Sequence, residues 1–129
     1  MDEFEHAIVS STYSGEALSL AAAKAALNVY RENDVIGHFY AMGDRLMKGL
    51  NVLFEQHDYP LQACGLAPCT ALAEREAGRT VDNALGELFR EAYVHGLSLF
   101  TVCYINYSHQ EADIDEALAR MEETLKALA

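Results

Sequence analysis

The feature that most constrains the fold is a set of apolar residues that recurs every three or four positions between residues 36 and 54. This spacing predicts an α-helix with one apolar face, which must pack against a core. Asp34 is a suitable N-cap for this helix, and Tyr59-Pro60 ends it, because proline forces extended geometry on the residue before it. The predicted core stripe consists of Ile36, Phe39, Tyr40, Gly43, Leu46, Met47, Leu50, Leu53 and Phe54.

Two further helices are predicted in the second half of the chain. One spans residues 81–95, is capped by Thr80 and is closed by Gly96. The other follows Ser108, which forms a capping box with Glu111. Their predicted buried faces comprise Leu85, Leu88, Phe89 and Ala92 in the first, and Ile114, Leu118, Met121, Leu125 and Leu128 in the second.

Three short segments are predicted to be extended. Residues 61–64 and 68–74 flank the sequence Gly65-Leu66-Ala67, and residues 97–105 are rich in β-branched and aromatic side chains. The sequence contains no internal repeat, linker or low-complexity tract. We therefore expect a single α+β domain over residues 1–129.

Composition excludes several classes of protein. The 129 residues carry a formal net charge of -11, which disfavours nucleic acid and anionic membranes as partners. The apolar stretch 17–26 is too short to cross a bilayer. Five histidines are scattered without a partner at helical spacing, so a metal site has little support. Three cysteines, Cys64, Cys69 and Cys103, are not spaced as a zinc or disulfide framework and indicate buried, reduced thiols in a cytoplasmic protein.

A polar turn, Ser10–Glu16, precedes an alanine-rich helix predicted over residues 16–32. Ser14 or Gly15 is expected at the start of this helix. The first turn of a helix offers unpaired N–H groups and the positive end of the dipole, which suit a phosphate. Serine and threonine are also the commonest N-caps, and on spacing alone an ordinary cap is the favoured interpretation.

Residues 11–23, which include this turn, resemble a segment of the class III pyridoxal-phosphate aminotransferases, in particular those similar to glutamate-1-semialdehyde aminomutase. The likeness continues through Gly65–Pro68, Tyr93–Leu97 and Ser108–Asp115, and so covers nearly the whole chain. It implies that residues 1–32 form the phosphate turn and an interdomain helix. It also implies that residues 33–129 form the C-terminal small domain, with a small antiparallel sheet and about four helices.

The resemblance implies roles for two residues of the turn. Thr12 matches the threonine that binds the cofactor phosphate of the neighbouring subunit, and Ser11 could add a second donor. The expected cofactor of the parent enzyme is pyridoxal 5′-phosphate, and the expected partners are a second subunit, giving a dimer, or a missing large domain.

The resemblance also implies that catalytic groups are absent from this chain. The Schiff-base lysine and its accompanying groups lie upstream of the matched segment in the family. Lys24, Lys48 and Lys126 occupy positions typical of solvated surface, whereas such a lysine needs a desolvated pocket. We expect no catalytic residue and no activity in the chain alone. The alternative is a free-standing, self-associating module derived from that domain.

The remaining candidates have ordinary structural interpretations. Gly15 is expected to give freedom at a tight turn and close helix approach, and Glu16 to interact with the helix dipole. His109 occupies the position of a family histidine, and a structural hydrogen bond and a substrate role both remain open. For Tyr104, Asn106 and Tyr107, core packing is ranked above substrate contact.

Overall fold

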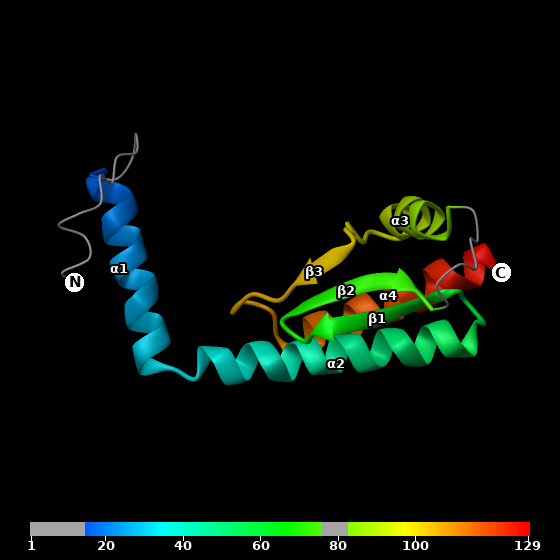
Figure 1. Ribbon diagram of the computed structural model, residues 1–129, viewed down its shortest axis with the longest axis horizontal. Coiled ribbons are helices and arrows are strands. Elements are labelled where there is room, and N and C mark those ends of the chain that lie inside the picture. Colours follow the sequence, from blue (N-terminus) through cyan, green and yellow to red (C-terminus); the bar gives the residue numbers. More distant parts are fainter. Residues whose placement is uncertain (1–14, 76–82) are drawn as a thin grey trace, which may run out of the picture. The chain divides into compact units, whose positions relative to one another are not determined.

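The computed structural model describes residues 15–75 and 83–129. It divides the chain into two compact units, Met1–Val35 and Ile36–Ala129, and each is considered by itself. Within the described ranges the second unit contains three helices and an antiparallel sheet of three strands (Figure 1). The predicted α+β class is confirmed, while the division of the chain at residues 32 and 33 stays a prediction.

Helix α1 (Ala17–Glu32) belongs to the first unit. Glu16 is its N-cap, rather than Ser14 or Gly15, because a carboxylate satisfies two N–H groups of the first turn. No residue of α1 is buried, and its large apolar side chains are exposed, for example Leu18 at 77% and Leu27 at 63%. Its alanine and leucine residues have high helix propensity, and within its own unit no apolar face of α1 is covered by the described residues.

Helix α2 (Val35–Gln56) supplies much of the core of the second unit. Leu50 and Phe54 are buried as predicted, and Met42, which the predicted stripe left out, is buried as well. The prediction is wrong for Ile36 and Tyr40, which are 54% and 47% exposed. These two residues lie one turn apart on the same ridge of the helix, and this ridge stays at the edge of the buried stripe.

The sheet consists of β1 (Leu61–Leu66), β2 (Cys69–Glu74) and β3 (Val102–Tyr104), in the order β1-β2-β3. The two extended segments predicted at residues 61–64 and 68–74 are confirmed as strands that pair in an antiparallel hairpin, and β1 also includes Gly65 and Leu66, with Leu66 opposite Cys69. The predicted strand over residues 97–105 is reduced to three paired residues.

The shortening of β3 follows from the extent of its pairing with β2. The N–H of Leu72 donates to the carbonyl of Thr101 at 2.8 Å, and this is the last contact before the preceding segment leaves β2. Residues 97–100 have no strand conformation and line a cavity instead. Strand propensity depends on such context, so the β-branched and aromatic composition alone overestimated the length of the strand.

Alternate residues of the sheet point inward, toward α2, α3 (Ala84–Val94) and α4 (Glu111–Leu128). The burial pattern alternates along β1 and β2, as expected for strands with one covered face. Figure 1 shows α4 behind the sheet and α2 running along it. The main core cluster comprises Leu50, Phe54, Leu61, Ala63, Leu72, Ala84, Leu88, Met121 and Leu125.

The caps of α3 and α4 differ from those predicted. Helix α3 begins at Ala84 after Asn83, which has a left-handed φ of 72°; Thr80 and Val81 lie outside the described residues. Helix α4 is capped by Gln110, whose backbone N–H donates to the Asp113 side chain at 2.8 Å, rather than by the pair Ser108 and Glu111. The predicted end of α3 is confirmed, because Gly96 follows it with a φ of 81°.

Two close approaches fix α2 against the hairpin. The side chain of Asn51 makes two hydrogen bonds to Ala63, donating to its carbonyl and accepting from its N–H, both at 2.8 Å. A Cβ on Gly43 would lie 2.1 Å from the carbonyl oxygen of Ala67, so a side chain there would displace the turn of the hairpin. Together these contacts set the position of α2 along the sheet.

We expect Phe54→Ala to lower the free energy of unfolding by about 3–5 kcal/mol. Phe54 is fully buried and stacks on Tyr59 with ring centroids 6.1 Å apart. Urea denaturation followed by circular dichroism measures the change. Val52→Ala is the matched control, since Val52 is 52% exposed on the same helix, and its effect should stay within about 0.5 kcal/mol. Equal losses for the two variants would contradict this description of the core.

Candidate functional site

The predicted phosphate-binding residues, Thr12 and Ser11, lie outside the described residues, as does Ser14. The described part of the turn begins at Gly15 and Glu16. Their roles in phosphate binding therefore stay predictions. What the structure describes is the neighbouring end of α1, where a phosphate would have to compete with the cap of the helix.

That end of α1 is occupied by the carboxylate of Glu16. It accepts from the N–H of Leu18 at 2.9 Å and from that of Ser19 at 2.6 Å. Hydrogen bonds from Ser19, and then from Leu18, lower the pKa of Glu16. This agrees with the predicted interaction with the helix dipole. These two donors of the first turn are therefore used by the cap of the helix.

Gly15 differs from its predicted role. It does not have the left-handed φ that would require glycine, and a Cβ placed on it would meet no described atom within 4 Å. Neither a strained turn nor a close helix approach at Gly15 is supported within the described residues.

The three lysines lie at the surface, as their helical positions predicted. Lys24 is exposed on α1, and the side chain of Lys48 is 75% exposed with its Nζ 3.3 Å from Asp44. Hydrogen bonds from Lys126 to Glu123 and Glu122 raise the pKa of Lys126. A lysine that forms a Schiff base needs the opposite, a desolvated pocket that lowers its pKa.

His109 lies in the turn before α4, where its contacts are structural. Its carbonyl accepts from Nε2 of His38 at 2.7 Å, and its Nδ1 accepts from the N–H of Asn106 at 3.3 Å. The Asn106 side chain in turn accepts from the N–H of Ser108 at 2.9 Å. Of the two interpretations left open for His109, these contacts support the structural hydrogen bond.

The tyrosines near β3 are not core residues. Tyr104 is 73% exposed, so its predicted core packing is wrong. The register pairs Tyr104 with Cys69, on the face of the sheet opposite the core. Tyr107 is 40% exposed and its ring meets that of His38 edge to face, with centroids 5.1 Å apart.

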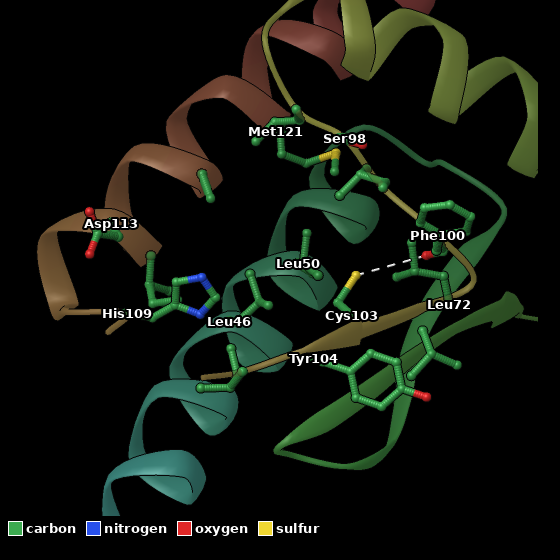
Figure 2. A pocket seen from close by; sticks show the side chains of 16 residues that line it. Leu46, Leu50, Leu72, Ser98, Phe100, Cys103, Tyr104, His109, Asp113 and Met121 are labelled. Atoms are coloured by element: carbon green, nitrogen blue, oxygen red, sulfur yellow. Dashed lines mark hydrogen bonds between the residues drawn. The ribbon is translucent and has the colours of Figure 1, made fainter. Parts of the chain in front are cut away.

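A cavity of about 400 Å³ lies between α2, α4 and residues 97–105 (Figure 2). Its lining includes Leu50, Leu72 and Met121 of the main core and Ile105 and Ile114 of a second cluster that also contains Met42. In Figure 2, His109 and Asp113 lie toward one end of the cavity and Phe100 toward the other. Most of its lining is aliphatic, so it offers apolar contact rather than a set of catalytic groups.

The polar side chains of this cavity are poorly suited to catalysis. Burial raises the pKa of the Cys103 thiol, which disfavours the nucleophilic thiolate. The Asp113 carboxylate is engaged in capping α4. All three cysteines are free and partly buried. Among the described residues no group of three or more histidine, cysteine or acidic side chains could hold a metal ion.

Helix α2 is tied to α4 by an ion pair on the surface. Arg45 donates to both carboxylate oxygens of Asp115, at 2.7 and 2.9 Å, and lies 3.7 Å from Glu111. This bidentate geometry lowers the pKa of Asp115, chiefly through the hydrogen bonds from Arg45. In residues 15–75 and 83–129, no helix is long and apolar enough to span a membrane.

Comparisons with known proteins find relatives of this chain in sequence and in fold. The chain is 28% identical over 141 residues to the 5-aminovalerate aminotransferase DavT of Pseudomonas putida, an alignment that covers 100% of the chain and 33% of that enzyme. It is 24% identical over 127 residues to the glutamate-1-semialdehyde 2,1-aminomutase of Archaeoglobus fulgidus, which covers 90% of the chain and 30% of the aminomutase. The whole chain is thus similar to about a third of an aminotransferase, and most of it to a similar share of an aminomutase.

The fold agrees with that of a solved structure. The PLP internal aldimine form of the FumI protein of Sphingopyxis sp. MTA144 matches 98% of the chain with a TM-score of 0.80 and 19% identity, over 31% of its own length. No protein-family model matches the chain. The chain thus spans about a third of the length of the class III aminotransferases and the structure it matches.

We expect Arg45→Gln to raise the pKa of Asp115 back toward its ordinary value. In the native chain that pKa is lowered, so the ion pair contributes to stability above the ordinary carboxyl pKa and is lost as pH falls through the lowered value. Carbon-13 NMR titration of the side-chain carboxyl measures the change. Lys48→Gln removes a different pair on the same helix and should leave Asp115 unchanged. An Asp115 pKa that is the same in the native chain and in the Arg45→Gln variant would show that the ion pair does not form in solution.

Proposed function

We propose that the chain is the C-terminal segment of a pyridoxal-phosphate-dependent aminotransferase or aminomutase. The complete protein would transfer an amino group between an amino donor and a carbonyl acceptor. The observation that carries this proposal is the match of the entire chain to one third of an aminotransferase. An aminomutase and the PLP internal aldimine form of FumI match over similar shares of their own length.

The cofactor, when bound, would supply the electron sink for this chemistry, and the protein would supply binding and orientation. In this proposal the Thr12 hydroxyl donates to the cofactor phosphate of the neighbouring subunit, and Ser11 adds a second donor. The Glu16 carboxylate already accepts from the N–H groups of Leu18 and Ser19, so this proposal assigns the phosphate to the hydroxyls of Thr12 and Ser11. The functional unit would be a dimer.

The chain alone would be inactive. Its sequence contains three lysines, and the structure places all of them at the surface. The lysine that binds the cofactor must therefore come from the rest of the enzyme. Three free cysteines and the absence of a disulfide in the described residues support a cytoplasmic location.

A free-standing, self-associating module is the second candidate. It is favoured by α1, none of whose residues is buried and which exposes Leu18, Leu20 and Leu27. Large uncovered apolar surfaces tend to bind partners. A chain that stays monomeric at high micromolar concentration in analytical ultracentrifugation would exclude this candidate.

The proposed function is tested with a chimera in which residues 1–129 replace the matched third of the Pseudomonas putida enzyme. We expect the chimera to bind pyridoxal 5′-phosphate and to transfer amino groups. The isolated chain should give no stoichiometric adduct after borohydride reduction and mass analysis. An adduct on one lysine of the isolated chain, or a folded chimera that neither binds the cofactor nor reacts, would overturn the proposal.

In the same chimera, Thr12→Ala should weaken binding of pyridoxal 5′-phosphate. A hydrogen bond to a charged group contributes about 1.5–3 kcal/mol, which corresponds to roughly 10- to 150-fold in the dissociation constant. Thr12→Ser keeps the hydroxyl and should restore most of the affinity. Fluorescence titration of the chimera without cofactor measures both values. Equal affinity in the native and alanine forms would remove Thr12 from the site.

A further inference from the structure

One cavity of the second unit has no role in the proposed function. Its volume is about 400 Å³, and it lies between α2, α4 and residues 97–105 (Figure 2). Leu50, Ile114 and Met121 line its floor and are at most 4% exposed. Phe100, which lies toward one end, is 74% exposed. The cavity therefore has a buried apolar floor and is open to solvent at its rim.

An alkyl chain fits the apolar part of this cavity. Apolar cavities of only about 150 Å³ already bind small apolar molecules. A chain of about eight carbons with one head-group atom would fill roughly two thirds of the cavity, at about 30 Å³ for each heavy atom. Each methylene that leaves water for such a lining strengthens binding about fourfold.

The Asp113 carboxylate gives the other end of the cavity a negative charge (Figure 2). Among the described residues, the lining contains no lysine and no arginine. One oxygen of this carboxylate accepts from the N–H of Gln110 at 2.8 Å. Arg45 pairs with two other carboxylates of α4, whereas no ion pair within the described part of the chain includes Asp113. The charge of Asp113 is thus available to a ligand.

The ring of His109, at the same end, does not compete with Asp113 for a ligand. Its Nδ1 accepts from the N–H of Asn106 at 3.3 Å, and its Nε2 lies 3.3 Å from the side-chain nitrogen of Asn106. Both ring nitrogens are therefore engaged within the turn before α4. The ring forms a wall of the cavity, and Asp113 provides its charge.

The start of α4 attracts a cation in spite of the helix dipole. The positive end of a helix amounts to about half a charge. Three carboxylates, those of Glu111, Asp113 and Asp115, lie near this end, and Arg45 offsets one of them. The remaining charge is negative, and the formal net charge of -11 acts in the same direction.

We propose that the cavity binds a primary alkylamine, with its ammonium group at the Asp113 carboxylate and its alkyl chain along the apolar floor toward Phe100. An ammonium group has three hydrogen-bond donors and no acceptor, and a carboxylate has only acceptors, so the two are complementary. A neutral alcohol would gain the apolar contacts without the charge, and a fatty acid would be repelled. This inference goes beyond the proposed function and does not depend on it.

Isothermal titration calorimetry of the chain with octylamine, octanol and octanoate at neutral pH tests the proposal. We expect one octylamine to bind per chain, at least about tenfold more tightly than octanol, because a hydrogen bond to a charged group contributes at least that factor. Hexylamine lacks two methylenes and should bind about 16-fold more weakly than octylamine. Equal affinity for octylamine and octanol would overturn the proposal.

Asp113→Asn removes the charge and keeps an oxygen that can cap α4. It should lower the affinity for octylamine at least about tenfold and leave the affinity for octanol unchanged. Glu111→Gln is the matched control, since it removes a charge from the same turn at a residue outside the lining. Equal losses in both variants would exclude Asp113 as the partner of the ammonium group. If Asp113→Asn does not fold, the comparison of octylamine with octanol in the native chain still decides.

A second pair of variants tests whether the ligand occupies this cavity. Ala117 lines it, so Ala117→Phe should fill the space and abolish binding of octylamine. Ala119→Phe, at an exposed position of the same helix, should preserve binding. The melting temperature of each variant verifies that it is folded. Undiminished binding in folded Ala117→Phe would overturn the proposal.

The cysteines report the position of the ligand without a substitution. The Cys103 side chain lines the cavity, in Figure 2 between Leu50 and Phe100, whereas Cys64 and Cys69 are not part of the lining. With octylamine at about ten times its dissociation constant, alkylation of Cys103 by iodoacetamide should slow about tenfold. Alkylation of the other two cysteines, followed by mass spectrometry of each peptide, should not change. A Cys103 that reacts equally fast with octylamine bound would place the ligand elsewhere.

The same titrations on the chimera, prepared without cofactor, distinguish the inference from the proposed function. A chimera that prefers octylamine to octanol supports the inference whether or not it transfers amino groups once cofactor is added. Binding to the isolated chain but not to the folded chimera would show that the rest of the enzyme fills the cavity. That result would overturn the inference and leave the proposed function standing.

Discussion

The structure of residues 36–129 depends on the burial of one face of a three-stranded sheet beneath three helices. Leu61, Ala63 and Leu72 provide that face, and Leu50 and Phe54 of α2 pack onto it. A sheet of this size has no hydrophobic interior of its own, so its strands are stable only where helices cover them. The hairpin, the position of α2 and the placement of α4 all follow from this one layer of contacts.

Elements whose signal is local and periodic could be predicted from the sequence. The apolar periodicity predicted α2 and α4, and the extended segments on either side of Gly65-Leu66-Ala67 predicted β1 and β2, because each signal lies within the element itself. The capping residues of α3 and α4 were harder to predict, because several residues near each helix start are suitable caps and tertiary packing selects among them. Strand β3 was overestimated because pairing with β2, a contact distant in sequence, ends at Thr101.

The same distinction between local sequence signals and contacts distant in sequence applies to the functional assignment. Short motifs indicated a resemblance to the class III aminotransferases, because the order of turns and helices can be read from the sequence. The aminotransferase and the aminomutase that match the chain agree with this resemblance. The side chains that share one face of the sheet could not be identified in this way. Which of Cys64, Cys103 and Tyr104 share a face depends on the register between three strands. The exposure of Tyr104 followed from that register and contradicted the expectation from alternation alone.

The contact between Asn51 and Ala63 also affects how the chain behaves in solution. Strand β1 lies at one edge of the sheet, where free N–H and C=O groups could pair with a strand of another molecule. The Asn51 side chain takes both backbone groups of Ala63 in the middle of that edge. The Asn51 side chain thus takes the place of a neighbouring strand at this position, but it offers no further backbone groups for pairing. In this way it protects an apolar hairpin from aggregation by edge-to-edge pairing.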